Sequence, residues 1–142
     1  MSWSDWREIN QPAGYEDCAV YRIRLASAKG AASINRFLGT DTQGLLCIGE
    51  TSDFDRRRRR FVRGVKHGKV HPGAKLLHRL ENVTSLKTIY PGYVYQYSFR
   101  KIGSKKEAEF FEERLIKAYV KQFGEAPPLN SIIPKRDEEE GW

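Results

Sequence analysis

The alternation of hydrophobic and polar residues predicts two β-strands, and a short apolar run predicts a third. Asp17–Leu25 alternates in its C-terminal half, and Tyr93–Lys101 carries aromatic side chains at every second position. Gly44–Gly49 is an apolar run between two glycines. Side chains two residues apart lie on the same face of a strand, so each alternating stretch has one face suited to burial. The residues expected on these faces are Tyr21, Ile23, Leu25, Tyr93, Tyr95, Tyr97 and Phe99.

Two helices are predicted between the second and third strands. The first begins at Ser52 or Asp53, either of which can cap the free amides of the first turn, and runs to about Val65. A shorter helix follows the His-Pro-Gly sequence at 71–73 and covers Ala74–Leu80. The helices and strands together predict an α+β fold, in which helices flank a small three-stranded antiparallel sheet.

The last helix has the strongest signals. Ser104 and Glu107 form a capping box, in which each side chain bonds a free backbone amide near the other. The helix is expected to run from Lys105 to about Phe123, and Gly124 is expected to end it.

One carboxylate of this helix falls on the apolar side. At 100° per residue the apolar side chains form a stripe, with Glu112 inside it and Glu113 outside. A bare carboxylate there costs several kcal/mol unless it is paired or bound to a cation. An ion pair with an arginine and a role as metal ligand both meet this requirement. The stripe consists of Ala108, Phe111, Leu115, Ile116, Ala118, Tyr119 and Phe123.

The length of 142 residues fits one domain, which we place at 1–142 with a core of about 17–131. The core lies between an irregular N-terminal arm, which Trp3 and Trp6 can pack, and a charged C-terminal tail. The connection Ala26–Thr42 is long for a hairpin, and we expect part of it to form a short helix.

The net charge of +7 is unevenly distributed. Ten Lys or Arg and no Asp or Glu lie between Arg56 and Arg79, together with all three histidines. A block of one sign on a folded domain is typical of nucleic-acid binding, although a solvated basic surface has the same pattern. The candidate DNA-binding residues are Arg56, Arg58, Arg59, Arg60, Arg63, Lys66, Lys75 and His78.

The chain has neither a long apolar run nor a recognisable secretory signal, and its two cysteines do not make a disulfide framework. We therefore expect no membrane association and a cytoplasmic location, at the nucleoid if the protein is bacterial.

Two short motifs on the predicted strands resemble the signatures of the GIY-YIG endonucleases. Ala19-Val20-Tyr21 stands where the family has Gly-Ile-Tyr, at the end of the first strand. Cys47-Ile48-Gly49 stands where the family has Tyr-Ile-Gly, on the second strand. Three further motifs follow in the family's order, so the resemblance covers most of the chain.

These later motifs carry charged and polar residues. The stretch 49–57 is similar to Gly-x-Thr-x-x-Leu-x-x-Arg and places the family arginine on Arg57. The stretch 112–119 is similar to Glu-x-x-Leu-Ile-x-x-Tyr and places the metal-binding glutamate on Glu112. Pro-Leu-Asn at 128–130 is similar to the closing motif, whose asparagine lines the site, here Asn130.

The resemblance implies cleavage of DNA phosphodiesters with one divalent ion, Mg²⁺ or Mn²⁺. Glu112 would hold the ion, and Tyr21 would orient or deprotonate the attacking water. Arg57 would neutralise charge that grows on the phosphate, and Asn130 would fix the phosphate or the glutamate. An enzyme of this size that cuts both strands of a duplex is expected to form a homodimer.

The sequence departs from the family pattern at several positions. Cys47 replaces the first tyrosine of the second motif and cannot supply a phenol hydroxyl. Phe61 occupies a position where some members have a histidine or tyrosine, and His67 or His78 could fill that space. Two alternatives to an endonuclease follow. One is a module of the same fold that binds DNA but cuts weakly or not at all. The other is a chromatin- or RNA-associated basic domain, with Glu112 in a structural ion pair.

Overall fold

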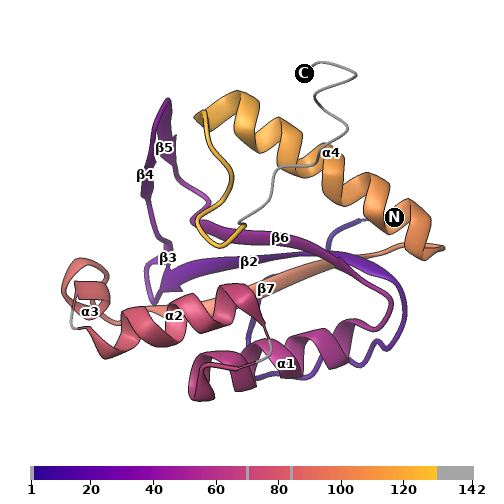
Figure 1. Cartoon of the computed structure of the whole chain (residues 1–142), viewed down its shortest axis with the longest axis horizontal. Helices are drawn as coiled ribbons and strands as arrows, with labels where there is room; N and C mark the ends of the chain where they lie inside the picture. Colours follow the sequence, from indigo (N-terminus) through magenta and orange to yellow (C-terminus); the bar gives the residue numbers. More distant parts are fainter. Residues whose placement is uncertain (1, 70, 84, 131–142) are drawn as a thin grey trace.

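The centre of the fold is β2 (Ala19–Ser27), an antiparallel strand with a hydrogen-bonded neighbour along each edge. β7 (Val94–Lys101) pairs along one edge over eight residues of β2, and β6 (Leu45–Thr51) pairs along the other (Figure 1). These long strands confirm the three strand predictions and the α+β class. The structure is a computed structural model that describes residues 2–69, 71–83 and 85–130.

The sheet has five strands rather than the three predicted, because two short strands extend it. β1 (Arg7–Glu8) pairs with β7, and β3 (Gly30–Ala31) pairs with the end of β2. The N-terminal arm also bonds β7 outside β1, where the Ser4 N–H donates to the Phe99 carbonyl at 2.8 Å. The edge of a strand has unpaired N–H and C=O groups, and the arm satisfies those of β7.

The long connection forms a hairpin instead of the expected short helix. β4 (Ile34–Arg36) and β5 (Gly39–Asp41) pair with each other in a separate two-stranded sheet. Asp41 then turns the chain into β6, because its carboxylate accepts hydrogen bonds from the Gln43 and Leu45 amides at 2.8 and 3.1 Å.

The first and last helices match their predicted ranges closely. α1 is Phe54–His67 and α4 is Lys105–Phe123. The Asp53 carboxylate caps α1 by accepting from the Arg56 amide at 3.1 Å. The Ser104 hydroxyl caps α4 by accepting from the Glu107 amide at 3.2 Å.

The middle helices differ more from the predictions. α2 is Pro72–Asn82, which begins earlier than predicted, because His71 caps the helix directly before Pro72, and ends two residues later. A further short helix, α3 (Ser85–Ile89), has no counterpart in the predictions. No helix among the described residues is long and apolar enough to cross a membrane.

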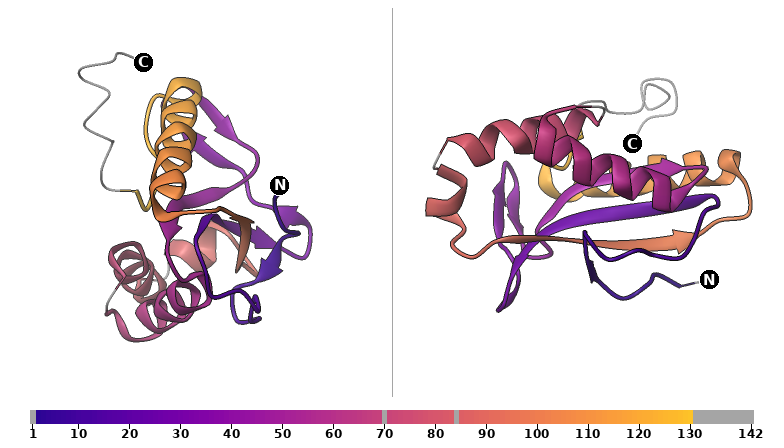
Figure 2. Two further views of the ribbon diagram at one scale, coloured as in Figure 1. Left: turned by 90° about the vertical axis from the view of Figure 1, so that its right-hand side faces the viewer. Right: turned by 90° about the horizontal axis from the view of Figure 1, so that it is seen from below.

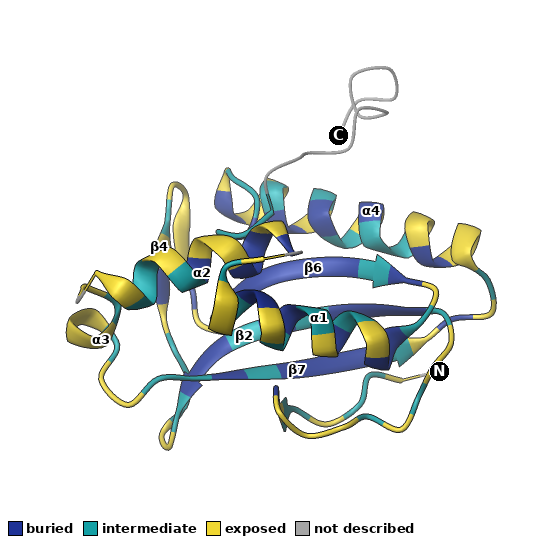
Figure 3. Ribbon diagram, turned by 60° about the horizontal axis from the view of Figure 1, so that its bottom comes forward, coloured by how far each residue is buried: buried dark blue, intermediate teal, exposed yellow. Residues whose placement is uncertain are grey.

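The helices cover both faces of the sheet (Figure 2). α1 and α2 lie on the face that carries the aromatic side chains, where the Phe54 ring is 5.7 Å from that of Tyr21 and 4.7 Å from that of Phe99. α4 covers the other face near β6, where Ile48 packs in one cluster with Ile116. Figure 3 shows buried residues along all three long strands and exposed residues on the outer sides of the helices.

The rest of the α4 face is covered by the N-terminal arm. Trp3 and Trp6 lie over Arg22 and Arg24 of β2, with guanidinium-to-ring distances of 4.0 to 4.8 Å. The arm is therefore packed by its two tryptophans, as the sequence suggested. The predicted charged C-terminal tail lies outside the described residues.

Candidate active site at the edge of β6

Tyr21 and Gly49 are direct partners in the pairing of β2 with β6. A Cβ atom on Gly49 would lie 2.4 Å from both Cζ and Oη of Tyr21, so the tyrosine ring lies over the glycine backbone. Gly49 is therefore required for space, because any side chain would displace the ring. The Tyr21 side chain is buried, and its hydroxyl forms no hydrogen bond with the part of the chain that the structure describes.

Glu112 approaches the same strand from α4. Its side chain is partly buried, and burial together with the charge of Glu50 raises the pKa of Glu112 to about 7. The Glu50 backbone amide and the Arg57 guanidinium act in the opposite direction by stabilising the carboxylate. The partial burial of Glu112 agrees with its predicted place inside the apolar stripe.

The rest of the stripe prediction is partly wrong. Glu113 was placed outside it but is buried, with the Lys117 amine 3.9 Å from its carboxylate. Ala118 was placed inside but is exposed. A helical wheel assumes one covered side, whereas α4 contacts β2, β5 and β6.

Glu50 is part of this site and was missed by the sequence reasoning. It lies at the end of β6, with the Lys105 amine 3.4 Å from its carboxylate, and its charge raises the pKa values of both Tyr21 and Glu112. The available signal was its position directly after the glycine of the second motif. The structure thus brings Tyr21, Glu50, Arg57 and Glu112 together, from four separate elements.

Tyr21 and Cys47 are both neutral at physiological pH. Burial raises the pKa of Tyr21 above its ordinary value of 10, and Arg57 only partly opposes this effect. Burial also raises the pKa of the Cys47 thiol to about 12. Cys47 belongs to the main hydrophobic core, so its thiol has the environment of a core residue rather than that of a nucleophile.

The arginine run divides into three groups. Arg57 and Arg60 are half-buried, and Arg58 is buried. The remaining cations of α1 form a solvent-exposed row with spacings of three or four residues, which places them on one side of the helix. This exposed row consists of Arg56, Arg59, Arg63 and Lys66. On α2 Lys75, a candidate DNA-binding residue, is also exposed.

Arg58 was predicted to bind DNA, and this prediction is wrong. Its guanidinium pairs with Asp55 at 3.0 Å and donates to the Ile9 carbonyl at 3.0 Å. Asp55 in turn accepts from the Ala13 and Gly14 amides, each at 3.0 Å. These bonds hold the N-terminal arm against α1 and leave Arg58 7% exposed.

The histidines also differ from the predictions. His78 was assigned to DNA, but its Nδ1–H donates to the Val65 carbonyl at 2.8 Å and its ring lies against Gly68. His67 is exposed at the end of α1. The histidine beside Phe61 is His71, whose ring centroid is 5.2 Å away in an edge-on contact.

His71 is held in one orientation. Its Nδ1 accepts from the Ala74 amide at 3.2 Å, which places the proton of the neutral ring on Nε2. Burial, with the charges of Arg57 and Arg60, lowers the pKa of His71 to about 4. A histidine before a proline at the start of a predicted helix was the signal for this capping role.

Asn130 ties the C-terminal loop to β6. Its carbonyl oxygen accepts from the Ile48 amide at 2.9 Å, and its amide nitrogen donates to the Ile48 carbonyl at 2.8 Å. The Leu129 amide also donates to the Leu46 carbonyl at 2.8 Å. Asn130 therefore lies beside the second motif and positions the loop there, with both ends of its side chain bonded to backbone.

The described residues contain no group of three or more His, Cys, Asp or Glu side chains that could hold a metal ion. Glu112 and Glu50 remain as a pair of carboxylates with mutually unfavourable charges. Mg²⁺ commonly takes only one or two carboxylates from the protein and the rest of its ligands from water and phosphate. The donor set therefore fits such an ion.

Comparison with protein-family models, with curated proteins and with solved structures gives no match for this chain.

Proposed function

We propose that this protein is a divalent-metal-dependent DNA endonuclease of the GIY-YIG type. The observation that carries the proposal is the convergence of Tyr21, Arg57 and Glu112, which come from β2, α1 and α4. The antiparallel sheet with α1 and α2 on one face and α4 on the other supports the same proposal, because the resemblance implies an antiparallel sheet flanked by helices.

Glu112 would hold the metal ion, with Glu50 close enough to share its charge. When bound, Mg²⁺ supplies Lewis-acid stabilisation of charge on the scissile phosphate. Arg57 reaches the same region from α1, and its planar guanidinium suits two phosphate oxygens. Asn130 acts through Ile48, because it fixes the strand that carries the second motif.

Tyr21 acts as a hydrogen-bond donor that orients water or phosphate. A buried phenol with a raised pKa is a poor base, and its free hydroxyl keeps its proton at neutral pH. This role is narrower than the one expected from the sequence, where orienting and deprotonating the water were both open.

The exposed row of α1 would bind the backbone of the DNA. From Arg56 to Lys66 the helix rises about 15 Å, which is long enough to contact two or three successive phosphates. The row lies on the helix that carries Arg57, so phosphate contacts would also fix the distance between the scissile bond and the catalytic arginine.

A DNA-binding module that does not cut is the second candidate. Cys47 is a neutral, buried thiol at the position of a family tyrosine, so one of the two phenols that border the family site is missing. In such a module the exposed row of α1 would still bind DNA, and Glu50 and Glu112 would have no catalytic role.

Cleavage by the full chain tests the proposal. Duplex, single-stranded and branched DNAs are incubated with Mg²⁺, Mn²⁺ or EDTA. We expect cleavage only with the metal ions, and a loss of roughly a hundredfold or more in Glu112→Gln with DNA binding retained. Glu109→Gln is the matched control, because Glu109 is exposed on the same helix.

Binding without cleavage on every substrate would support the second candidate. Cleavage that Glu112→Gln leaves unchanged would refute the assigned site while preserving the activity. Cys47→Tyr is informative only if it still folds, because the cysteine lies in the core. A gain of activity in that variant would show that the cysteine weakens the site.

A further inference from the structure

The β4–β5 hairpin exposes two large apolar side chains at its turn. Phe37 is 77% exposed and Leu38 is 61% exposed, and we refer to these two residues as the apolar tip. Exposed apolar side chains of this size lose hydrophobic stabilisation unless a partner covers them. The hairpin stands beside the C-terminal end of α4 (Figure 1).

The apolar tip is rigidly mounted on the end of α4. The Leu38 amide donates to the Phe123 carbonyl at 3.0 Å, and the Phe37 amide donates to the Glu125 carboxylate at 2.7 Å. Arg36 forms an ion pair with the same carboxylate and donates to the Ala126 carbonyl at 2.9 Å. These bonds hold the backbone beneath the two exposed apolar side chains in one conformation. The turn is therefore better suited to binding a partner than a flexible loop would be.

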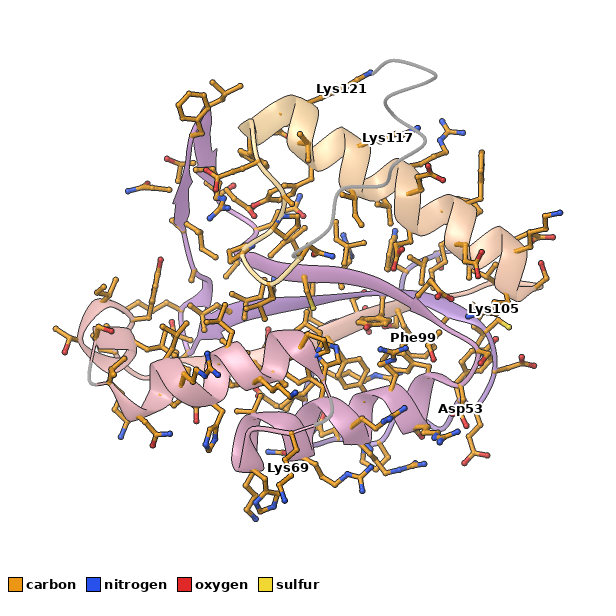
Figure 4. All side chains as sticks on the ribbon, in the orientation of Figure 1. Asp53, Lys69, Phe99, Lys105, Lys117 and Lys121 are labelled. Carbon is orange, nitrogen blue, oxygen red and sulfur yellow. The ribbon has the colours of Figure 1, made fainter. Side chains whose placement is uncertain are left out.

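The same helix links the apolar tip to the candidate active site. From Glu112 to Phe123 α4 rises about 16 Å, at roughly 1.5 Å per residue. Successive phosphates of one DNA strand advance about 3.4 Å along the duplex axis, so a duplex that lies along α4 would cover this distance in about five base steps. Lys121 is exposed on the last turn of α4, and Figure 4 shows it on the same helix as Lys117.

We infer that the apolar tip inserts between base pairs of the bound DNA, about five base steps from the bond that is cut. Phe and Leu are side chains that DNA-binding proteins use as wedges to unstack and bend a duplex. The inference rests on the proposed function for the position of the cut, but it needs only DNA binding for the insertion itself.

A protein partner suits the apolar tip less well. Two side chains bury at most a few hundred Å², whereas a stable protein interface needs about 800 Å² on each partner. Two wedge residues on a rigid hairpin are sufficient for insertion into DNA, because the exposed row of α1 supplies affinity elsewhere. The net charge of +7 also favours an anionic partner.

A scan of base stacking in bound DNA tests the inference with the full chain. The probe is a duplex that the wild-type protein binds, with the fluorescent base 2-aminopurine at one position at a time and Ca²⁺ in place of Mg²⁺. We expect brightening, which reports unstacking, at one step about five positions from the cut. The double variant Phe37→Ser, Leu38→Ser should lose this signal and bind DNA roughly tenfold more weakly.

Phe110→Ser is the matched control, because Phe110 is also an exposed phenylalanine, at 52% exposure, but lies on α4 rather than in the hairpin. It should keep both the fluorescence signal and the affinity. The thermal unfolding midpoint of the double variant should stay at the wild-type value, because the bonds that mount the hairpin come from backbone groups and from Arg36.

Five outcomes test the inference together with the proposed function. A signal that persists in the double variant, or no signal on bound DNA, overturns the inference and leaves the nuclease proposal intact. The inference is also overturned if the wild-type protein is a dimer and the double variant is a monomer, because the apolar tip is then a protein contact. A signal on DNA that is bound but never cut supports the inference and refutes the nuclease. No DNA binding refutes both.

Discussion

The arginines of α1 and those of the sheet have opposite surroundings. In the exposed row, the guanidinium groups have no ion-pair partner within the described residues. On the α4 face of the sheet, Arg22 lies between Trp3 and Trp6, Arg24 lies over Trp6, and Arg100 lies 4.9 Å from the Phe111 ring. The same type of side chain is therefore exposed and available to a ligand in one region and is a packing element in the other. Arg58 belongs with the second group despite its place in the run.

The largest effect is expected at Arg58. Arg58→Ala leaves Asp55 buried without its cation and the Ile9 carbonyl without a donor, so we expect the free energy of unfolding to fall by about 3 kcal/mol. Arg59→Ala, one residue away and exposed, should change it by less than about 0.5 kcal/mol. Urea denaturation of both variants measures the difference. Equal losses of stability in the two variants would contradict the division into buried and exposed arginines.

Trp6→Ala tests the packing role on the other face. The substitution removes the ring that contacts Arg22 and Arg24 and the apolar area that it covers, so we expect a loss of about 2 kcal/mol in stability. DNA affinity, measured by fluorescence anisotropy below the unfolding transition, should not change. A parallel loss of affinity would place the sheet arginines at the DNA surface.

The salt dependence of DNA binding distinguishes the two groups at single residues. Arg63→Ala should reduce the slope of log affinity against log salt concentration by about 0.9, which corresponds to one phosphate contact. Arg24→Ala should leave the slope unchanged, because its guanidinium donates two bonds to the Gln96 side chain at 2.9 and 2.7 Å. A slope that falls equally in both variants would show that the exposed and the packed arginines do not differ in phosphate contact.

An element of the fold could be predicted from the sequence when the residues of that element, or those next to it, carry the signal for it. β2 and β7 carry alternation, β6 is an apolar run between glycines and α4 has a capping box, so each signal lies in local sequence and all four elements were predicted. The two-residue strand β1 has no period of its own and exists because the edge of β7 has free backbone groups. The hairpin in the long connection is likewise stabilised by the end of α4, which is distant in the sequence.

The same division holds at the candidate site. The resemblance pointed to Tyr21, Arg57 and Glu112 through the order of its motifs, and the structure brings these three residues together. Arg58 was misassigned, since a run of five arginines does not show which one turns inward until Asp55 is recognised as its partner three residues earlier. His71 was overlooked in favour of His67 and His78, because its position beside Phe61 depends on how α2 packs against α1.

The smallest effect concerns Arg57, which follows the exposed Arg56 and precedes the buried Arg58 and whose charge lowers the pKa values of both His71 and Glu112. Burial, with help from Arg57, lowers the pKa of His71 from 6.5 to about 4, so His71 contributes stability above pH 6.5 that is lost as the pH falls toward 4. The contribution of Glu112 to stability depends on pH in the opposite direction. Its pKa is raised from 4.5 to about 7, so its contribution is present below pH 4.5 and is lost as the pH rises through 7.

Two variants separate these opposing contributions in EDTA. In Glu112→Gln only the histidine remains, and stability should fall more steeply than in wild type between pH 6.5 and pH 4.5. In His71→Asn, which preserves a capping side chain, the same acidification should lower stability less than in wild type. Urea denaturation across this range measures both slopes.

Arg57→Gln should raise the pKa values of His71 and Glu112 together, because the guanidinium charge lowers both. NMR titration would detect these two shifts. If neither value moves, Arg57 does not face these groups and does not belong to the candidate site.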